Sequence, residues 1–341
     1  LLPKNHEAAI AATSRRPDNG WLPTPADRSQ IAYGADSRVQ DLLAVAEAGE
    51  LPGLRDVAAI AASWFFGNNR AGVPMYDPAT GRTFDGVNAD ASVNRNAGAE
   101  STIHGLLTML ALDAMPETAD AARVATVSSR ATWSLAEAED AQTISDGQRV
   151  TPESAWTGEG QWSGGTYVAL KSGGSLGWQL PPANQPRLVL PVIERVEAAS
   201  GARSTWTADG RPLGTVDHAG AGKQGDSATP GAVEMVSLPS VLPANATQVR
   251  VTADGPAVVD AVLVQPLVEQ VVLGDGSRHG RALLRSFAAD RRVARVEVPG
   301  EGAATVSVHD SSGRLVLRSR VAEGRQVSAD VLAGGFTVIE R

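Results

Sequence analysis

Apolar residues recur every three to four positions in the first third of the chain. Within residues 99–112, Ile103, Leu106, Leu107 and Leu110 fall on one face of a predicted helix. The same period predicts a helix that begins at Asp36 as its N-cap and ends at Gly49, and a second helix from 54 to 66. An Ala-rich helix at 6–16 and a Pro-initiated helix near 116–127 complete the pattern. Residues 1–130 are therefore predicted to form four or five amphipathic helices paired into αα-hairpins.

A polar stretch of about thirty residues, rich in Gly, Asn, Asp and Pro, follows the apolar run at 64–66. A structureless loop of this length is unusual inside a compact domain and is often functional. The stretch contains Asp77 and Asp85, and Glu100 begins the helix that follows it. The pattern thus predicts three carboxylates near the ends of two helices.

The period changes to alternation after residue 133. Short alternating segments at 166–170, 177–180, 187–192, 248–252 and 257–264 are separated by Gly- and Pro-rich turns. Such spacing predicts a β-sandwich or jelly roll over 131–266. Alternation resumes at 292–298, 304–309, 314–318, 326–331 and 336–339, with a hairpin turn at 310–313, which predicts a small β-sandwich over 267–341. The fold class is thus multidomain α + β, with domains at 1–130, 131–266 and 267–341.

Composition narrows the function classes. Hydrophobic residues make up 43% of the 341, which is enough for a sizeable core, and the net charge of −8 without a long basic run argues against nucleic-acid binding. The absence of cysteine excludes disulfides and thiolate metal sites. No apolar run approaches 18 residues, so no membrane span is expected. The start, Leu1-Leu2-Pro3-Lys4, is neither an initiator Met nor a signal peptide, which predicts processing or a larger parent chain.

Several motifs in the first third occur in a recognisable order. They are AYGADSRVQDLL at 32–43, WFFGNN at 64–69, MYDPATG at 75–81, DGV at 85–87 and NAGAEST at 96–102. This series resembles part of an (α/α) toroid of the six-hairpin-glycosidase type. The resemblance implies about twelve helices, of which four or five fit here. It therefore implies that an N-terminal segment or a partner chain completes the helical domain, or that the domain is not a toroid.

A second set of motifs lies between 131 and 265. It comprises ATWSLAEAEDA, SGGTYVALKSGGSLGWQL and AVVDAVLVQ. The order of Glu137, Glu139, Gly164-Gly165, Tyr167 and Asp260 resembles calcium-containing jelly-roll carbohydrate-binding modules, which are galactose-binding-like. In that family the first and last strands are neighbours, which would bring the three acids together.

The residue pattern also favours a structural calcium ion at Glu137, Glu139 and Asp260. Two glutamates two apart on a strand share one face, and two adjacent carboxylates repel unless a cation lies between them. Asp260 interrupts an otherwise apolar strand, where a lone acid is costly. Calcium binds carboxylate oxygens in this way. The alternative is that the glutamates are solvated edge-strand charges and that Asp260 caps a loop.

Asp77, Asp85 and Glu100, together with Asp36, are candidates for the acid and base of glycoside hydrolysis. Each also has a structural explanation. Asp77 begins a D-P-x-T-G turn, Asp85 precedes Gly86 in another turn, and Glu100 suits the first turn of a helix. Carboxylates that converge on an open groove would favour hydrolysis, and carboxylates spread over surface turns would favour a scaffold.

Aromatic residues are candidates for sugar stacking, because sugar rings have apolar C–H faces. Trp156 and Trp162 lie among Gly, Ser, Thr and Gln and are the candidate ligand contacts, although a loop tryptophan can equally cover a core. Tyr167 and Trp178 lie within alternating segments and are expected in the core. His104 is expected to be a partly buried, hydrogen-bonded side chain.

These observations predict recognition of a polysaccharide by a secreted or cell-surface carbohydrate-active protein. In one hypothesis the chain belongs to a glycoside hydrolase or polysaccharide lyase whose toroid is completed by another segment or chain. In the other it is a non-catalytic glycan-binding or cell-envelope scaffold protein. The first hypothesis predicts that the helices of residues 1–130 leave an apolar face uncovered.

Overall fold

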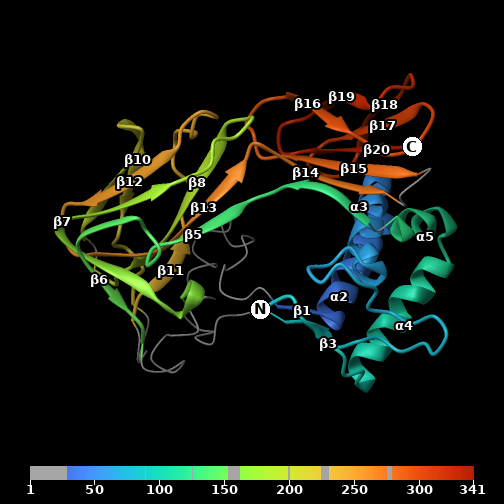
Figure 1. Ribbon diagram of the computed structural model, residues 1–341, viewed down its shortest axis with the longest axis horizontal. Coiled ribbons are helices and arrows are strands. Elements are labelled where there is room, and N and C mark those ends of the chain that lie inside the picture. The colour runs from blue at the N-terminus through green and yellow to red at the C-terminus, as the bar shows by residue number, and fades with distance from the viewer. Residues whose placement is uncertain are drawn as a thin grey trace. The chain divides into compact units, whose positions relative to one another are not determined.

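The computed structural model describes residues 29–88, 90–124, 126–152, 162–198, 200–223, 230–274 and 279–341. The fold is mostly β-sandwich with a few helices (Figure 1). Two compact units are present. The large sandwich unit comprises residues 133–267, and the mixed unit comprises residues 29–132 together with 268–341. None of the described helices has the length and hydrophobicity that a bilayer crossing needs.

The mixed unit begins with helices that pack against one another in pairs, some adjacent in sequence and some not. The α-helices are α2 (Ala32–Ala48), α3 (Pro52–Ala62), α4 (Ala99–Asp113) and α5 (Pro116–Arg123), and a 3-10 turn η1 (Ser63–Phe66) follows α3. Helix α2 packs on α3 and α4, and α3 packs on α5. Pro52 and Pro116 stand at the helix starts, where a missing N–H costs nothing. A shared core of Val, Ala and Leu side chains, among them Val39, Ala58 and Leu112, holds the four helices together.

The loop between η1 and α4 is ordered by short strands and turns. It contains β2 (Gly86–Val87) and β3 (Val93–Asn94), which pair with each other, and β2 also pairs with β1 (Gln30–Ile31). Gly67, with φ of +125°, ends the helical run as the sequence predicts. The buried Asn69 amide donates to the carbonyls of Trp64 and Val73. The long loop is thus a packed structure around Phe65 and Met75.

Two details of the helical prediction are corrected. Helix α2 begins at Ala32, so Asp36 is not its N-cap but a buried residue in its second turn. The helix predicted near 116–127 ends at Arg123, and residues 126–131 form strand β4 instead. The predicted helix at 6–16 lies outside the described residues. Helix α4, by contrast, lies where the sequence places it.

Helix α4 buries mainly small residues and exposes four of its large ones. Ser101, Gly105 and Thr108 are on the buried face. A Cβ added at Gly105 would lie 1.9 Å from the Thr83 hydroxyl oxygen, so the close approach of the loop requires glycine. The predicted apolar stripe points outward, with exposed fractions of 55% for Ile103, 39% for Leu106, 44% for Leu107 and 64% for Leu110.

The C-terminal part of the mixed unit is a small β-sandwich. Its strands are β4 (Thr126–Ala131), β14 (Val268–Gly274), β15 (Gly280–Ser286), β16 (Arg292–Glu297), β17 (Ala304–His309), β18 (Leu315–Val321), β19 (Gln326–Val331) and β20 (Phe336–Glu340). One sheet has the order β18-β17-β20-β15-β14-β4, and β16 pairs with β19. Valine side chains from both sheets fill the core between them. The alternation in this segment predicted five of these strands within a few residues.

Helix α3 packs directly on this sandwich. A Cβ at Gly53 would lie 2.4 Å from the His309 ring, and Arg281 of β15 forms an ion pair with Asp56 at 3.3 Å. Strand β4, which follows α5, pairs with β14. The structure therefore unites the segments predicted as separate domains at 1–130 and 267–341, because the helices bury part of their surface against the sheet and contribute a strand to it.

Among its described residues, the large sandwich unit has nine strands, whose buried side chains form a main core and a smaller cluster that includes Leu190 and Met235. The strands are β5 (Ser134–Glu137), β6 (Thr143–Val150), β7 (Tyr167–Gln179), β8 (Arg187–Arg195), β9 (Arg203–Ala208), β10 (Arg211–Asp217), β11 (Ala232–Met235), β12 (Gln248–Ala253) and β13 (Ala257–Pro266). The pairing order is β10-β9-β12-β7-β13-β8-β11, with β5 on β13 and β6 on β7. Trp178 and Trp206 stack with ring centroids 5.9 Å apart in the core. The expectation that Trp178 is a core residue is confirmed.

Candidate functional site

The three acids predicted to bind calcium come from two paired strands and the residues just beyond one of them. Strand β5 pairs with β13, with Glu137 opposite Ala261, so the first strand of the unit lies beside its last. The Ala138 N–H donates to the Asp260 carbonyl at 2.9 Å, which continues the pairing towards Glu139. The register of β13 against β8 shifts between Val259 and Ala261. A bulge re-aims the side chain that it carries, and here that side chain is Asp260.

A short turn at Ser163–Gly165 joins the three acids. The Ser163 N–H lies 3.1 and 3.2 Å from the two Asp260 carboxylate oxygens, and the Ser163 hydroxyl donates to Glu137 Oε1 at 2.9 Å. Gly164 has φ of +67°, and a Cβ there would lie 2.9 Å from Glu139 Oε1. The Gly-Gly motif is therefore explained by a left-handed turn that passes against a carboxylate.

Asp260 is buried, Glu137 and Glu139 are half-buried, and the neighbouring carboxylates contribute to raised pKa values of Asp260 and Glu139. Asp260 has no exposed surface, and burial, with Glu137 and Glu139 nearby, raises its pKa well above the ordinary value although the Ser163 N–H opposes the shift. Burial, followed by the charges of Glu137 and Asp140, raises the pKa of Glu139 to about 7. Glu139 Oε2 is buried without a hydrogen-bond partner among the described residues. The site thus concentrates negative charge, which the nearby Arg149 opposes at Glu139.

The spacing of these carboxylates is not that of a preformed metal cage. Among the described residues, no group of three or more His, Asp or Glu side chains is close enough together to hold a metal ion. A cation at this site would therefore have to draw the carboxylates inward. The buried Oε2 of Glu139 and the carboxylate oxygens of Asp260 supply hard oxygen donors of the type that calcium binds.

The same turn leads to an aromatic and acidic group. Trp162 contacts Tyr167, with ring centroids 4.3 Å apart and planes tilted by 41°. Burial, and then the charge of Glu194 on β8, raise the pKa of Tyr167. Burial raises the pKa of Glu194 itself to about 7. Tyr167 is half-buried rather than a full core residue, so its ring and Glu194 offer an aromatic face beside a carboxyl group.

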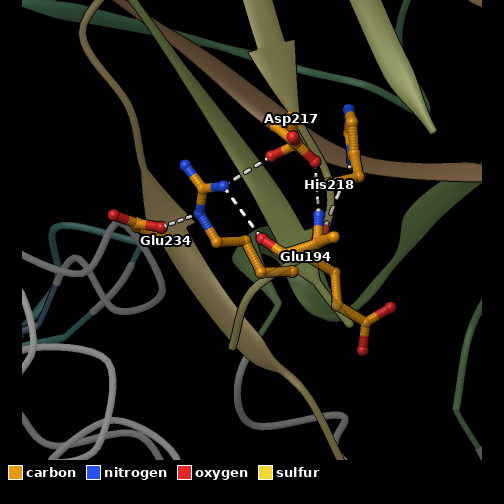
Figure 2. Close-up of polar contacts among 6 residues, drawn as sticks. Glu194, Asp217, His218 and Glu234 are labelled. Carbon is orange, nitrogen blue, oxygen red and sulfur yellow. Dashed lines mark hydrogen bonds and ion pairs between the residues drawn. The ribbon is translucent and has the colours of Figure 1, made fainter. Parts of the chain in front are cut away.

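Glu194 lies beside a buried polar network that sets the end of β8. The guanidinium of Arg195 forms an ion pair with Glu234 on β11 and donates to the carbonyls of Asp217, at 2.6 Å, and of Ala219, at 3.1 Å (Figure 2). The His218 ring is hydrogen-bonded to the Glu194 carbonyl and to the Ser204 hydroxyl. Figure 2 shows the Glu194 carboxylate pointing away from Glu234. The sequence analysis missed Glu194, whose signal is a single acid in the apolar strand β8.

The two tryptophans predicted to contact a ligand are Trp156 and Trp162. Trp156 lies outside the described residues. Trp162 has only 6% of its surface exposed and rests on Tyr167, so it has little free face for a sugar ring. The Trp162 ring packs against the ring of Tyr167, because the backbone just before Ser163 directs the Trp162 side chain into the interior of the unit.

The predicted catalytic acids have structural partners close by in the mixed unit. Asp77 is exposed, accepts the Ala79 N–H and the Thr80 hydroxyl at 2.9 and 2.7 Å, and these hydrogen bonds hold its pKa below the ordinary value. Asp85 accepts the Gly98 N–H at 3.0 Å and the Ser101 hydroxyl at 2.6 Å, and so caps the start of α4. Glu100 is exposed in the first turn of α4. Asp77 thus has the turn role, and Glu100 the first-turn position, that the sequence offered as alternatives to catalysis, whereas Asp85 precedes strand β2 and contacts the start of α4 instead of making the expected turn.

Asp36, the fourth candidate acid, is the most constrained. It is 2% exposed and accepts hydrogen bonds from Gln40 at 3.0 Å and Thr108 at 2.6 Å, and the His104 Nδ1 lies 2.6 Å away. His104 is itself 32% exposed, which confirms the expected partly buried, hydrogen-bonded histidine. The cluster joins α2 to α4.

Comparisons with known proteins give a partial likeness. The sequence matches no protein-family model and no curated protein. Solved structures with similarity include the C-terminal CBM6 of LamC from Zobellia galactanivorans, at 16% identity and a TM-score of 0.29 over 39% of this chain and 98% of that one. The carbohydrate-binding module CBM6cm-2 of Cellvibrio mixtus lichenase 5A, in complex with cellotriose, has 18% identity, a TM-score of 0.29, and coverage of 39% and 95%. A family 35 carbohydrate-binding module from Clostridium thermocellum has 20% identity, a TM-score of 0.31, and coverage of 39% and 98%.

Proposed function

We propose that the large sandwich unit recognises a polysaccharide and that the chain is part of a secreted or cell-surface carbohydrate-active protein. One observation carries the proposal. The three motifs that resemble calcium-containing carbohydrate-binding modules lie far apart in the sequence, and their Glu-x-Glu, Gly-Gly-x-Tyr-Val and Asp residues meet at one turn. The tyrosine of that motif then lies beside the carboxyl group of Glu194.

The chemistry of this face suits a sugar. Tyr167 offers a ring for the apolar C–H face, and a Glu194 carboxylate accepts hydrogen bonds from hydroxyl groups. Because the pKa of Glu194 is about 7, the fraction of the ionised acceptor grows as the pH rises through neutrality. Binding is therefore expected to strengthen from pH 6 to pH 8.

A structural calcium ion is part of the proposal. Glu137, Glu139 and Asp260 would hold it, and it would offset the repulsion between the three carboxylates and tie β5 to β13. The turn at Ser163–Gly165, which positions Tyr167, would then depend on the ion for its order.

The binding proposal is tested on the full chain with a glycan array followed by calorimetric titration of the best glycan. Tyr167→Ala and Glu194→Gln are each expected to weaken binding tenfold or more, which corresponds to about 1.4 kcal/mol. The matched control is Tyr33→Ala, an exposed tyrosine of the mixed unit, which should leave the affinity unchanged. Glycan binding that survives both sandwich variants would place the binding site elsewhere.

The helical part supports a finer proposal, that further helices pack on α4 and complete a toroid of a glycoside hydrolase or lyase. A contiguous apolar face on a helix is normally covered by another segment. The buried face of α4 carries Ser101, Gly105, Thr108 and Leu112, and the opposite face carries four exposed Ile and Leu residues. A non-catalytic glycan-binding or scaffold protein is the alternative, and the turn and cap roles of Asp77 and Asp85 favour it.

The absence of cysteine makes this second proposal testable by labelling. The variant Leu110→Cys is expected to react rapidly with a maleimide in the isolated chain and slowly in the native assembly, because a covering helix excludes the reagent. Ser319→Cys, on the exposed strand β18, is the control that should react rapidly in both. Equal reactivity at position 110 in both preparations would contradict a covering segment, and peptide mapping of the native protein identifies that segment if it exists.

A further inference from the structure

A polar cluster between helices α2 and α4, which pack together in the mixed unit (Figure 1), fixes the tautomer of a histidine. Asp36 on α2 is buried, and its Oδ1 accepts the Gln40 amide N–H at 3.0 Å and the Thr108 hydroxyl at 2.6 Å. Its Oδ2 lies 2.6 Å from Nδ1 of His104 on α4. An ionised carboxylate only accepts, so Nδ1 carries the proton of the neutral ring and Nε2 carries the free lone pair.

Solvent reaches this Nε2 atom. It has no hydrogen-bond partner among the described residues, and it is not one of the side-chain nitrogens that are buried without a partner, as Nδ1 of His309 is. The His104 side chain is 32% exposed, and the ring of Tyr33 lies beside it with centroids 6.1 Å apart. The two nitrogens lie on different edges of the ring, so Nε2 is directed away from Asp36. The lone pair is therefore held in one direction and is open to a ligand.

Glu100 places a second electron-pair donor next to this nitrogen. It is exposed on α4, one turn before His104. Side chains four residues apart on a helix have Cβ atoms about 5–6 Å apart, and each leans towards the N-terminal end of the helix. The imidazole of His104 therefore leans towards the Glu100 carboxylate. The pair presents a nitrogen lone pair and carboxylate oxygens on one flank of α4.

The chemistry of this pair selects a metal ion. A carboxylate that accepts from one ring nitrogen orients a histidine for metal binding at the other nitrogen and makes it more basic. Imidazole together with a carboxylate suits zinc, copper and nickel, whereas calcium takes oxygen donors alone. An anion would be repelled by Glu100. A sugar hydroxyl group has one proton for two acceptors, so it would leave one of them unsatisfied.

We propose that Nε2 of His104 and the carboxylate of Glu100 bind a divalent transition-metal ion, zinc in the first place, with Asp36 as the positioning residue. The site shares no residue with the calcium site proposed for the sandwich unit. No group of three His, Asp or Glu side chains among the described residues is close enough together to bind the ion, so the protein supplies two donors. The other coordination positions are left to water or to an oxygen of a ligand, as in zinc sites that keep an open position.

The test uses the full chain, with 15N-labelled histidine, and zinc chloride. Zinc is expected to shift Nε2 of one imidazole in long-range 1H–15N spectra, and this signal should be missing from His104→Gln. Titration calorimetry in excess calcium chloride, which occupies sites built of oxygen alone, measures the zinc affinity. His104→Gln should abolish the site and Glu100→Gln should weaken it at least fivefold. His279→Gln, which replaces an exposed histidine elsewhere in the mixed unit, is the matched control and should leave it unchanged.

Asp36→Asn separates positioning of the imidazole from packing of the helices. The amide oxygen takes the place of Oδ1, where Gln40 and Thr108 donate, so the amide nitrogen faces Nδ1 and donates to it. The ring proton then moves to Nε2 and removes the lone pair that binds the ion. Zinc affinity should fall tenfold or more, and the 15N shifts of His104 should report the exchanged tautomer. Thr108→Val removes a hydrogen bond from the same carboxylate without exchanging the tautomer and should change the affinity less than twofold.

Three results would overturn the inference. Zinc that leaves every imidazole nitrogen unshifted would mean that Glu100 and His104 hold a proton between them and no metal ion. Zinc affinity that survives His104→Gln would place the ion elsewhere on the chain. An unchanged affinity in Asp36→Asn, with the tautomer exchanged and the melting temperature retained, would contradict Nε2 as the ligand. Glycan binding by the sandwich unit is measured separately, so each of these results leaves the proposed function standing.

Discussion

Chelation with EDTA is expected to lower the melting temperature of the large sandwich unit by about 10 °C, and added calcium should restore it. A ligand that binds only the folded state at one hundred times its Kd stabilises that state by about 2.7 kcal/mol, and each kcal/mol shifts the midpoint of a domain of this size by several degrees. Differential scanning calorimetry of the full chain measures the effect as a shift of one transition. An unchanged transition would contradict the calcium site.

The stability of the calcium-free sandwich unit is expected to depend on pH. The pKa of Glu139 is raised from 4.5 to about 7 in the folded chain, and that of Asp260 is raised as well. For a group with a raised folded-state pKa, the stabilisation is present below the unfolded pKa and is lost as the pH rises through the folded pKa. The calcium-free unit should therefore lose stability between about pH 4.5 and pH 7. Calcium binds the ionised carboxylates, so its stabilising effect should grow over the same window.

Two variants separate the metal from ordinary burial. Asp260→Asn keeps the shape and an oxygen for the Ser163 N–H but removes one buried charge. We expect it to abolish the calcium response without lowering the stability measured in EDTA. Glu139→Gln should do the same and reduce the loss of stability between pH 4.5 and pH 7, because the contribution of Asp260 remains. Glu323→Gln, an exposed acid of the mixed unit, is the control that should leave the calcium response intact.

Glu234→Ala is expected to destabilise the large sandwich unit by about 3–5 kcal/mol. The side chains of Arg195 and Glu234 are each only 9% exposed, so removing the carboxylate leaves a buried guanidinium charge with carbonyl acceptors alone. Urea unfolding followed by tryptophan fluorescence measures the loss, since Trp178 and Trp206 report on this core. The loop that carries Asp217 and Ala219 is held by the same guanidinium and should loosen with it.

The ion-pair explanation has two further consequences. Replacing both partners, Arg195→Met with Glu234→Leu, should recover most of the lost stability, because an apolar pair of similar volume carries no desolvation cost. Asp120→Ala breaks a pair whose partners are 59% and 81% exposed and should cost no more than about 0.5 kcal/mol. A double variant that is as unstable as Glu234→Ala would attribute the effect to packing rather than to charge.

Local sequence determined much of the secondary structure. The spacing of apolar residues located α4, and alternation located β12, β13, β17 and β19 nearly to the residue. The reason is that side chains return to the same face every 3.6 residues in a helix and every 2 residues in a strand. It also singled out the acids at 137, 139 and 260 and the Gly-Gly turn, whose positive φ only glycine adopts easily. These features depend on neighbours close in the chain.

Tertiary structure alone decided which of these features meet and which face each one buries. The stripe at Ile103 and Leu110 has the period of a core face, yet α2 and the loop at Thr83 pack on the small residues of the opposite face, since only these allow a close approach. Strand β4 joined the C-terminal sheet through backbone hydrogen bonds that any sequence can make. Glu194 came beside Tyr167 because β7 and β8 both pair with β13. Periodicity specifies a face, but the contact that covers it depends on residues that lie from about twenty to more than a hundred positions away.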